Sequence, residues 1–503
     1  LVATPYGFES HPGHFEGLDD GRSILADHIQ SAAMTRGYQL RITTAFLAIS
    51  AGLVSYTGLE FMLESVQKDF SMSADETMVL AQVSSGACLL VVFLVGTLAD
   101  RFGDRRLLNI ACSMFGVGAM IVGVAPGPTE LLIGQAIAGV GSIGMSIVGL
   151  SILAKTFPDP AHRSKAFGLF AVVAPVVAIV MPFMSTTVID RLNWRWVTVT
   201  WIAVSLAAVL FGRRCLPARP DVVRHAELIT PALAGIALSG IALTFSFLRA
   251  HTSTGDHGFK AAVSAAIGIC ALVAVVVTMR RIREPSLDIR AVREPGAVPI
   301  VLALFVVNGV NLFFFTYLML QYRYHQSLLE TAAILVLPQL TAAAGALLGG
   351  QLSARWGSAR VATWAFATAA VLSLGVMFAA AESSAWLPVI VLTLAAFPIA
   401  GAVGPLTHAF MDLAPADGNA AASSVRNSAV NLGIAIGGLL VGAVVFDELD
   451  ADTERTLVAY QKQVDAFHLA GIFCFFAYLG AALLLIVHQW RRRSSSFALQ
   501  ASV

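Results

Sequence analysis

The chain has 503 residues, of which 57% are hydrophobic and only 13% are charged. Soluble globular proteins carry about 25% charged residues, and disordered chains are poor in apolar residues, so the composition excludes both classes. Because a membrane-crossing helix needs roughly 20 apolar residues, this content predicts an all-α polytopic membrane protein. The net charge of +1 favours no class of partner.

Fourteen apolar runs follow one another along the chain, and their lengths are those of membrane spans. The runs are 42–65, 77–98, 107–126, 131–154, 166–188, 196–212, 228–248, 260–279, 297–320, 331–353, 361–380, 386–409, 427–446 and 466–488. The seventh and eighth runs contain long stretches without a charge, and we therefore count both as spans. The predicted fold has two six-helix halves with two inserted central helices.

The spans divide the chain into five parts. We predict a cytoplasmic N-terminal segment, a six-helix half, a linker with two additional helices, a second six-helix half and a cytoplasmic tail, over residues 1–40, 41–212, 213–294, 295–490 and 491–503. With the N-terminus inside, the inside connections carry about three times as many Lys and Arg residues as the outside ones, and none lies within a span away from its ends. This bias predicts a multi-pass protein of the plasma membrane. Omitting both inserted spans would preserve the bias, so it supports an even number of spans.

Two connections on the predicted inside have similar sequences. The segment from Gly96 to Arg106 reads GTLADRFGDRR, and the segment from Gly350 to Arg360 reads GQLSARWGSAR. They follow the second and the tenth span, and Gly, Leu, Arg, Gly and Arg recur at matching positions. Parallel halves related by an axis along the membrane normal are a transporter architecture. The repeat therefore predicts two related halves.

The first of these connections resembles the loop signature of the major facilitator superfamily. The matching residues are Gly96, Asp100, Arg101, Gly103, Arg105 and Arg106. Four other stretches are similar to the fourteen-span drug:proton antiporter branch of that family, namely WRW at 194–196, EPSLDIR at 284–290, YLMLQ at 317–321 and GNAAASSVRN at 418–427.

This resemblance implies a transporter rather than an enzyme. Its two halves would rock to expose a central cavity to each side in turn, and the loop from Gly96 to Arg106 would latch one half against the other. The partners implied are a small organic substrate, protons and the lipid bilayer. We expect a monomer that uses no cofactor, metal ion or nucleic acid.

Departures from the branch bear on proton coupling. Ser55 stands where the branch usually has an Asp in span 1, and Gln135 stands where it usually has an Arg in span 4. Pro182 keeps the proline of the antiport element in span 5. The glycines of that element are replaced by Met181, Ser185 and Thr186. The resemblance therefore supports membership of the family more strongly than it supports proton antiport.

Glu60 and Glu64 are the acids that lie inside an apolar run and away from both of its ends. An ionisable residue within a span is costly, and it marks a functional site by default. The two residues are four positions apart and share a helix face. We predict that Glu60 is the proton-coupling or cation-binding acid, with a structural hydrogen bond as the alternative. Glu64 lies nearer the predicted outer interface.

Several uncharged polar residues are candidates for contact with a substrate. They are Thr57, Gln135, Asn308, Asn311 and Tyr317. Interhelical hydrogen bonds explain any one of them without a substrate. Asn311 precedes a group of aromatic residues that suits an apolar or cationic compound, although such a group is also typical of a lipid-facing surface. Gly139 and Gly141 lie within an apolar run, which favours close helix packing over a phosphate-binding loop.

The sequence thus predicts a secondary active transporter of the multidrug efflux type. It would export lipophilic, cationic organic compounds at the expense of inward proton flow. A uniporter, or an exporter of an anionic or neutral metabolite or lipid with a different coupling, is the first alternative. A membrane sensor that transports nothing is the second.

Overall fold

The computed structural model describes most of the chain, and all the regular secondary structure in the described residues is helical. Those residues are 20–72, 74–157, 159–217, 227–249, 257–282, 290–310, 312–320, 324, 326, 328–376, 386–415, 418–445 and 457–500. The predicted all-α fold is confirmed. In hydrocarbon a helix satisfies its own backbone hydrogen bonds, which is why this composition selects helices.

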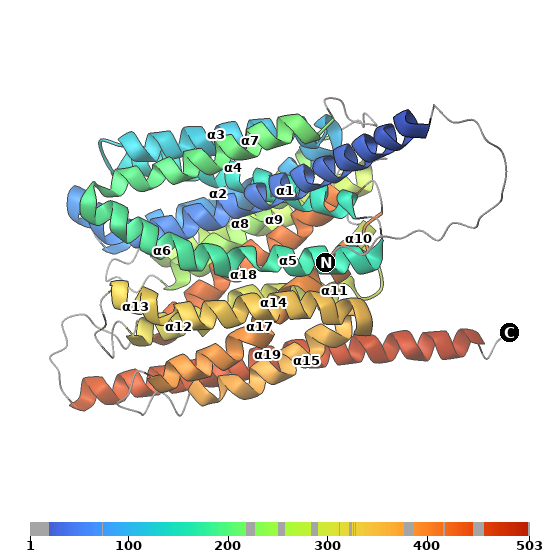
Figure 1. Ribbon diagram of the computed structural model, residues 1–503. Helices are drawn as coiled ribbons and strands as arrows, with labels where there is room; N and C mark the ends of the chain where they lie inside the picture. The colour runs from blue at the N-terminus through green and yellow to red at the C-terminus, as the bar shows by residue number, and fades with distance from the viewer. Residues whose placement is uncertain are drawn as a thin grey trace.

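The helices run side by side along one direction (Figure 1). The N-terminal group comprises α1 (Asp20–Phe70), α2 (Ala74–Phe102), α3 (Asp104–Val124), α4 (Pro128–Thr156), α5 (Pro160–Ala171), α6 (Val173–Arg191), η1 (Trp194–Val197) and α7 (Thr198–Cys215). Two helices follow it, α8 (Ile229–Arg249) and α9 (His257–Arg281). The C-terminal group comprises α10 (Arg290–Arg293), α11 (Ala297–Gly309), α12 (Leu312–Leu318), α13 (Leu328–Ile334), α14 (Val336–Trp356), α15 (Ser358–Ser373), α17 (Trp386–Met411), α18 (Asn419–Val445) and α19 (Leu457–Gln500).

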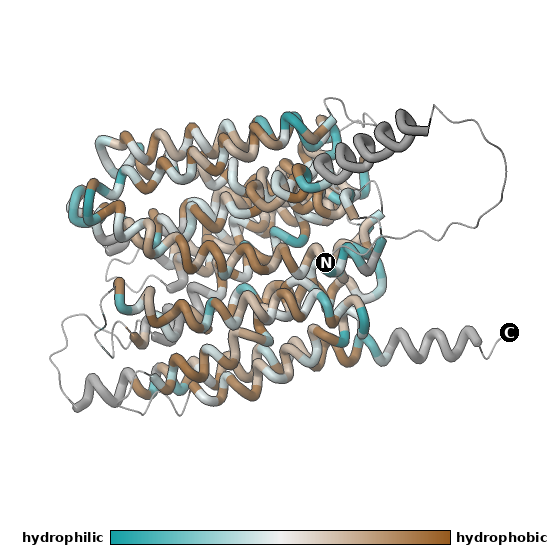
Figure 2. The backbone as a smooth tube through the Cα atoms, viewed as in Figure 1, coloured by the Kyte–Doolittle hydropathy of each residue, from teal (hydrophilic) through white to brown (hydrophobic). Residues whose placement is uncertain are grey.

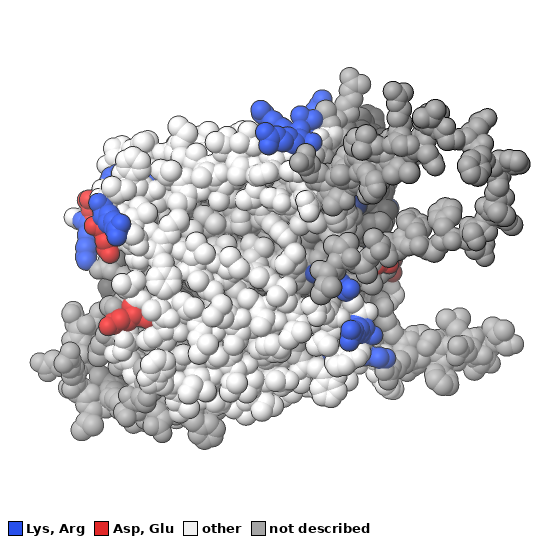
Figure 3. Space-filling view, in the orientation of Figure 1, with Lys and Arg blue, Asp and Glu red and all other residues white. Residues whose placement is uncertain are grey.

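Over the described residues, each of the fourteen predicted runs lies mostly on helices. Among the described residues, ten helices are long and apolar enough to cross a membrane, and two shorter apolar helices accompany them. Hydrophobic residues follow the helices through their middle (Figure 2). On the face drawn in Figure 3, charged side chains gather toward the ends of the helices and leave the broad middle free. This distribution is the one that a bilayer requires.

Each group packs around its own core. In the N-terminal group, α1 and α3 both pack against α4 and α7. In the C-terminal group, α17 packs against α14 and α15, and α19 packs against α15 and α11. The two groups meet where α2 and α4 contact α18 and where α5 contacts α14 and α17. Helix α8 pairs with α9 and packs against α2 and α18.

The repeated connections have the same backbone geometry. Gly103, between α2 and α3, has φ 80°, and Gly357, between α14 and α15, has φ 86°. Positive φ values are readily accessible only to glycine, which explains why both copies of the repeat keep this residue. The two connections are thus alike in backbone geometry as well as in sequence.

The first glycines of the repeat lie at two of the helix contacts between the groups. A Cβ atom on Gly96 of α2 would collide with Ser424 of α18 and lie 3.2 Å from the carbonyl oxygen of Ala420. A Cβ atom on Gly350 of α14 would lie 2.6 Å from the Cα atom of Gly168 in α5. The α2–α18 and α5–α14 contacts are therefore equivalent, and each depends on a residue without a side chain.

Two details differ from the predicted spans. Helix α1 begins at Asp20, well ahead of the predicted start at residue 42. Arg426, which we expected in a connection before the span at 427, lies inside α18 and is only 6% exposed. That expectation is wrong, because α18 already begins at Asn419 and a hydropathy window excludes a charged residue near its edge.

Candidate functional site

Glu60 lies in α1 with its side chain exposed, inside the apolar segment Tyr38–Leu63 and three residues before its end. Tyr56, one turn earlier on the same helix face, is 42% exposed. The opposite face of α1 is tightly packed: a Cβ atom on Gly58 would lie 2.9 Å from Nε1 of Trp201 and 3.2 Å from the terminal carbon of Met181. Packing thus turns Glu60 away from α6 and α7 and toward open space.

The other predicted site residues lie on several helices. Thr57 is half-buried in α1, and Asn308 in α11 donates to the carbonyl of Leu304 within its own helix at 2.8 Å. Tyr317 is half-buried in α12. Glu64 lies in α1, but its side chain falls outside the described residues, as does the whole of Asn311.

Gln135 in α4 is an isolated polar group in an apolar core. It is 1% exposed, and its Oε1 atom has no hydrogen-bond partner among the described residues. Leaving a buried acceptor unsatisfied costs about 1–3 kcal/mol. Such a residue is an unexpected choice for packing alone, and Gln135 therefore stays a candidate for substrate contact.

The glycines of α4 allow neighbouring helices to approach closely. A Cβ atom on Gly139 would lie 2.7 Å from the carbonyl oxygen of Ser84 in α2, and one on Gly141 would lie 2.7 Å from that of Ala111 in α3. In α6, Pro182 is buried within the helix. All three residues thus lie in packed helix interfaces.

The predicted latch loop joins α2, α3 and α4. Asp104 pairs with Nζ of Lys155 at 2.7 Å and accepts a hydrogen bond from Ser151 at 3.2 Å. Arg105 donates to the carbonyl of Leu216 at 3.4 Å. The remaining residues of the loop lie at the same end of the bundle, namely Asp100, Arg101 and the exposed Arg106. The acid at position 104 is therefore explained by a basic partner on α4.

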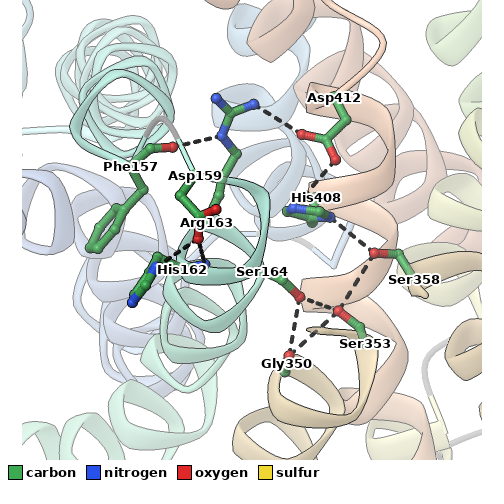
Figure 4. A network of polar contacts seen from close by, with 10 residues as sticks. All are labelled: Phe157, Asp159, His162, Arg163, Ser164, Gly350, Ser353, Ser358, His408 and Asp412. Carbon is green, nitrogen blue, oxygen red and sulfur yellow. Dashed lines mark hydrogen bonds and ion pairs between the residues drawn. The ribbon is translucent and has the colours of Figure 1, made fainter. Parts of the chain in front are cut away.

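A polar network that sequence reasoning missed connects the two groups at this end of the bundle (Figure 4). Nη1 of Arg163 in α5 lies 2.9 Å from Oδ1 of Asp412, just after α17. Nε2 of His408 lies 3.3 Å from the other oxygen of Asp412, and Nδ1 of His408 lies 2.9 Å from the hydroxyl of Ser358. Arg163 and Asp412 are 249 residues apart in the chain, so no sequence signal links them.

Beside this network, α5 and α14 are joined by hydroxyl groups. Ser164 donates to the carbonyl of Gly350 at 3.1 Å and also contacts the hydroxyl of Ser353 (Figure 4). A cavity of about 430 Å³ lies against the network, and its lining includes Asp159, Ser164, Ser353, Ser358, His408 and Asp412. This end of the group interface is held by an ion pair, hydroxyl contacts and close glycine packing together.

The opposite end of the N-terminal group carries a separate ion pair. Asp69, at the end of α1, accepts a hydrogen bond from Nε1 of Trp194 at 3.0 Å and pairs with Nη1 of Arg195 at 2.8 Å. These two donors hold the pKa of the Asp69 carboxyl group below its ordinary value. Arg195 also donates to the carbonyl of Ala125 at 3.2 Å, so the WRW stretch ties η1 to α1 and to the α3–α4 connection.

Known proteins with similar sequences are resistance and efflux proteins. The chain is 28% identical over 282 residues to a puromycin resistance protein of Streptomyces alboniger, a match that covers 56% of the chain and 54% of that protein, or about half its length. It is 26% identical to the multidrug resistance protein Stp of Mycobacterium tuberculosis, covering 78% of the chain and 73% of Stp. It is 25% identical to the drug efflux pump JefA of the same species, covering 84% of each chain.

A solved structure and a family profile agree with the helical arrangement. The human organic anion transporter MFSD10 has a similar fold, with a TM-score of 0.60, 16% sequence identity, and coverage of 89% of this chain and 99% of that one. The profile of the Major Facilitator Superfamily matches residues 44–438, which is most of the chain. With its two related helical groups and the shared loop geometry, this chain belongs to the Major Facilitator Superfamily, a family of membrane transporters.

Proposed function

We propose that this transporter exports lipophilic, cationic organic compounds in exchange for protons. The observation that carries the proposal is Glu60, an acidic side chain that is exposed within the apolar segment Tyr38–Leu63 of a membrane-spanning helix. Intramembrane acids in transporters serve as proton or cation sites. The similarity to resistance and efflux proteins supports an export function.

In this proposal the end of the bundle that holds the α2–α3 connection faces the cytoplasm. The Arg163–Asp412 pair and the Gly168–Gly350 contact close the interface at that end. Glu60, in the other half of the span, would then face the outside. The arrangement corresponds to an outward-facing state, in which a proton from outside replaces the substrate on Glu60.

Breaking the Arg163–Asp412 pair would open the cytoplasmic side. Its charge-assisted hydrogen bonds contribute about 1–3 kcal/mol, a range that solvent screening lowers because the two side chains are 21% and 34% exposed. A contact of this strength is large enough to bias two states and small enough to be broken in each transport cycle. Glu60, once protonated, would release its proton in the inward-facing state and accept a substrate cation.

Everted membrane vesicles test the proposal. A pH-sensitive dye reports the proton gradient, and a panel of lipophilic cations is added to vesicles that contain the wild type, Glu60→Gln or Glu130→Gln. Glu130 is an exposed carboxyl group at the start of α4 and serves as the matched control. We expect cation-dependent proton efflux in the wild type and the control and none in Glu60→Gln.

Two results would contradict the proposal. The first is full proton exchange in Glu60→Gln, which would remove Glu60 from the coupling mechanism. The second is the absence of proton movement with every cation in the wild type. That result would favour a uniporter, or an exporter of an anionic or neutral compound.

A further inference from the structure

Arg426 is a buried cation that the transport mechanism above does not use. Its Nη1 atom donates to Oδ1 of Asn427 at 3.2 Å, and the residue is 6% exposed. Its Nε atom is buried without a hydrogen-bond partner, and no carboxylate pairs with it among the described residues. Nε is therefore a buried donor of the guanidinium that is left unsatisfied.

A structural role does not account for this arginine. Its guanidinium carbon lies 5.2 Å from the centroid of the Phe170 ring. A cation–π contact recovers only part of what an ionised group loses when it leaves water. Buried charges are normally paired, and an intramembrane arginine without a partner marks a functional site by default.

The position of Arg426 in the fold is special. Gly168 in α5 and Ser424 in α18 are equivalent residues, because they contact Gly350 and Gly96 of the two repeats. Phe170 follows Gly168 by two positions, and Arg426 follows Ser424 by two positions. Phe170 and Arg426 are therefore equivalent as well. Since these equivalent residues also touch, they lie at the axis that relates the two groups. A group on this axis lies between the two halves, where alternating access exposes it.

Neighbouring residues fix the orientation of the guanidinium. The hydroxyl of Ser146 in α4 donates to the same Oδ1 atom of Asn427 at 3.2 Å, and the side-chain nitrogen of Asn427 donates to the carbonyl of Ser423 at 2.8 Å. Together with the bond that its Oδ1 atom accepts from Nη1 of Arg426, the side chain of Asn427 makes three hydrogen bonds. The Nε–Nη2 edge of the guanidinium matches the two oxygens of a carboxylate, which arginine binds bidentately.

We propose that Arg426 binds the carboxylate of an organic substrate at the interface between the two halves. The inference rests on the proposed transport function and extends its substrate class to compounds that carry a carboxylate, including zwitterions whose basic group meets Glu60. Inorganic anions share the charge but lack the apolar body that would lie against Phe170.

Direct binding to the full chain in nanodiscs tests this inference without depending on proton coupling. The probes are 2-naphthoate and decanoate, each compared with its own primary amide, and binding is followed by tryptophan fluorescence. The variants are Arg426→Gln, Arg426→Lys and, as the matched control, Arg355→Gln, which changes an exposed arginine at the end of α14. Thermal melts verify that each variant is folded.

We expect the wild type and Arg355→Gln to bind each carboxylate about ten- to a hundredfold more tightly than its amide, the range for a hydrogen bond to a charged group. Arg426→Gln should lose this preference, and Arg426→Lys should keep part of it. If Arg426→Gln does not fold, the comparison of acid and amide binding to the wild type tests the inference instead.

Three results would overturn the inference. They are equal affinity of the wild type for acid and amide, an unchanged preference in Arg426→Gln, and complete displacement of both carboxylates by chloride, which would assign the site to small inorganic anions. These binding results can be interpreted whether or not proton exchange is lost in Glu60→Gln vesicles. Failure of the proposed coupling and failure of the carboxylate site are therefore distinguishable.

Discussion

At the scale of single residues, the clearest electrostatic device is Asp69 with its donors Trp194 and Arg195. Because these donors lower the pKa of the Asp69 carboxyl group, the ionised form is stabilised in the folded protein relative to the unfolded chain. The contribution is complete above the ordinary Asp pKa of about 3.9. It is lost as the pH falls through the lower pKa of the folded state.

We predict that Asp69→Asn lowers the free energy of unfolding by about 0.5–1 kcal/mol at neutral pH, a value kept small because the carboxylate is 45% exposed. The difference from the wild type should vanish in strong acid. Thermal unfolding in nanodiscs at several pH values measures it, with Asp190→Asn at the exposed end of α6 as the control. A destabilisation that does not change with pH would contradict the electrostatic explanation.

At the scale of helices, the approach of α5 to α14 depends on Gly168 and Gly350. A methyl group on Gly350 would meet the backbone of Gly168 at 2.6 Å, and a backbone cannot rotate out of the way as a side chain can. We predict that Gly350→Ala destabilises the closed interface by about 1–3 kcal/mol, the usual cost of overpacking. Transport should fall accordingly.

Gly86→Ala is the matched control, because a Cβ atom at Gly86 in α2 has no neighbour within 4 Å. This change should leave transport intact, since alanine also favours the helix. Melting temperature and transport rate are measured for both variants. Equal behaviour of the two would show that the close α5–α14 contact does not matter.

The helices and their repeat were predictable from the sequence, whereas the contacts between them were not. Hydropathy located every run because the bilayer imposes length and composition on each helix separately. Gly103 and Gly357 were predictable as a pair because their backbone geometry is local. The Arg163–Asp412 contact depends on tertiary packing, and Arg426 was misplaced because its charge concealed the start of α18. The roles of Glu60 and Gln135 stay predictions.

At the scale of the whole molecule, the Arg163–Asp412 pair links the two groups and sets the balance between two states. We predict that Arg163→Gln opens the side of the cavity that holds Ser353. A cysteine at position 353, in a chain whose Cys215 and Cys270 are replaced by serine, should react with a membrane-impermeant maleimide about tenfold faster in Arg163→Gln, as the loss of about 1.4 kcal/mol would give.

The exchange of charges is the control for that experiment. A protein with both Arg163→Asp and Asp412→Arg should regain slow labelling, because the ion pair is restored in the opposite sense. If the cysteine at position 353 reacts equally fast with Arg163 present and in Arg163→Gln, the pair does not hold the two groups together. A cysteine that is exposed on the other side of the membrane should be labelled more slowly in Arg163→Gln than in the wild type.

The central claim is that proton and substrate compete for Glu60, and proton release tests it most directly. A lipophilic cation that the everted vesicles identify as a substrate is added to the purified protein in weakly buffered solution, and a pH indicator records the response. We expect proton release by the wild type and by Glu130→Gln, and none by Glu60→Gln, although each variant is folded. Substrate binding without proton release in the wild type, or undiminished release in Glu60→Gln, would contradict it.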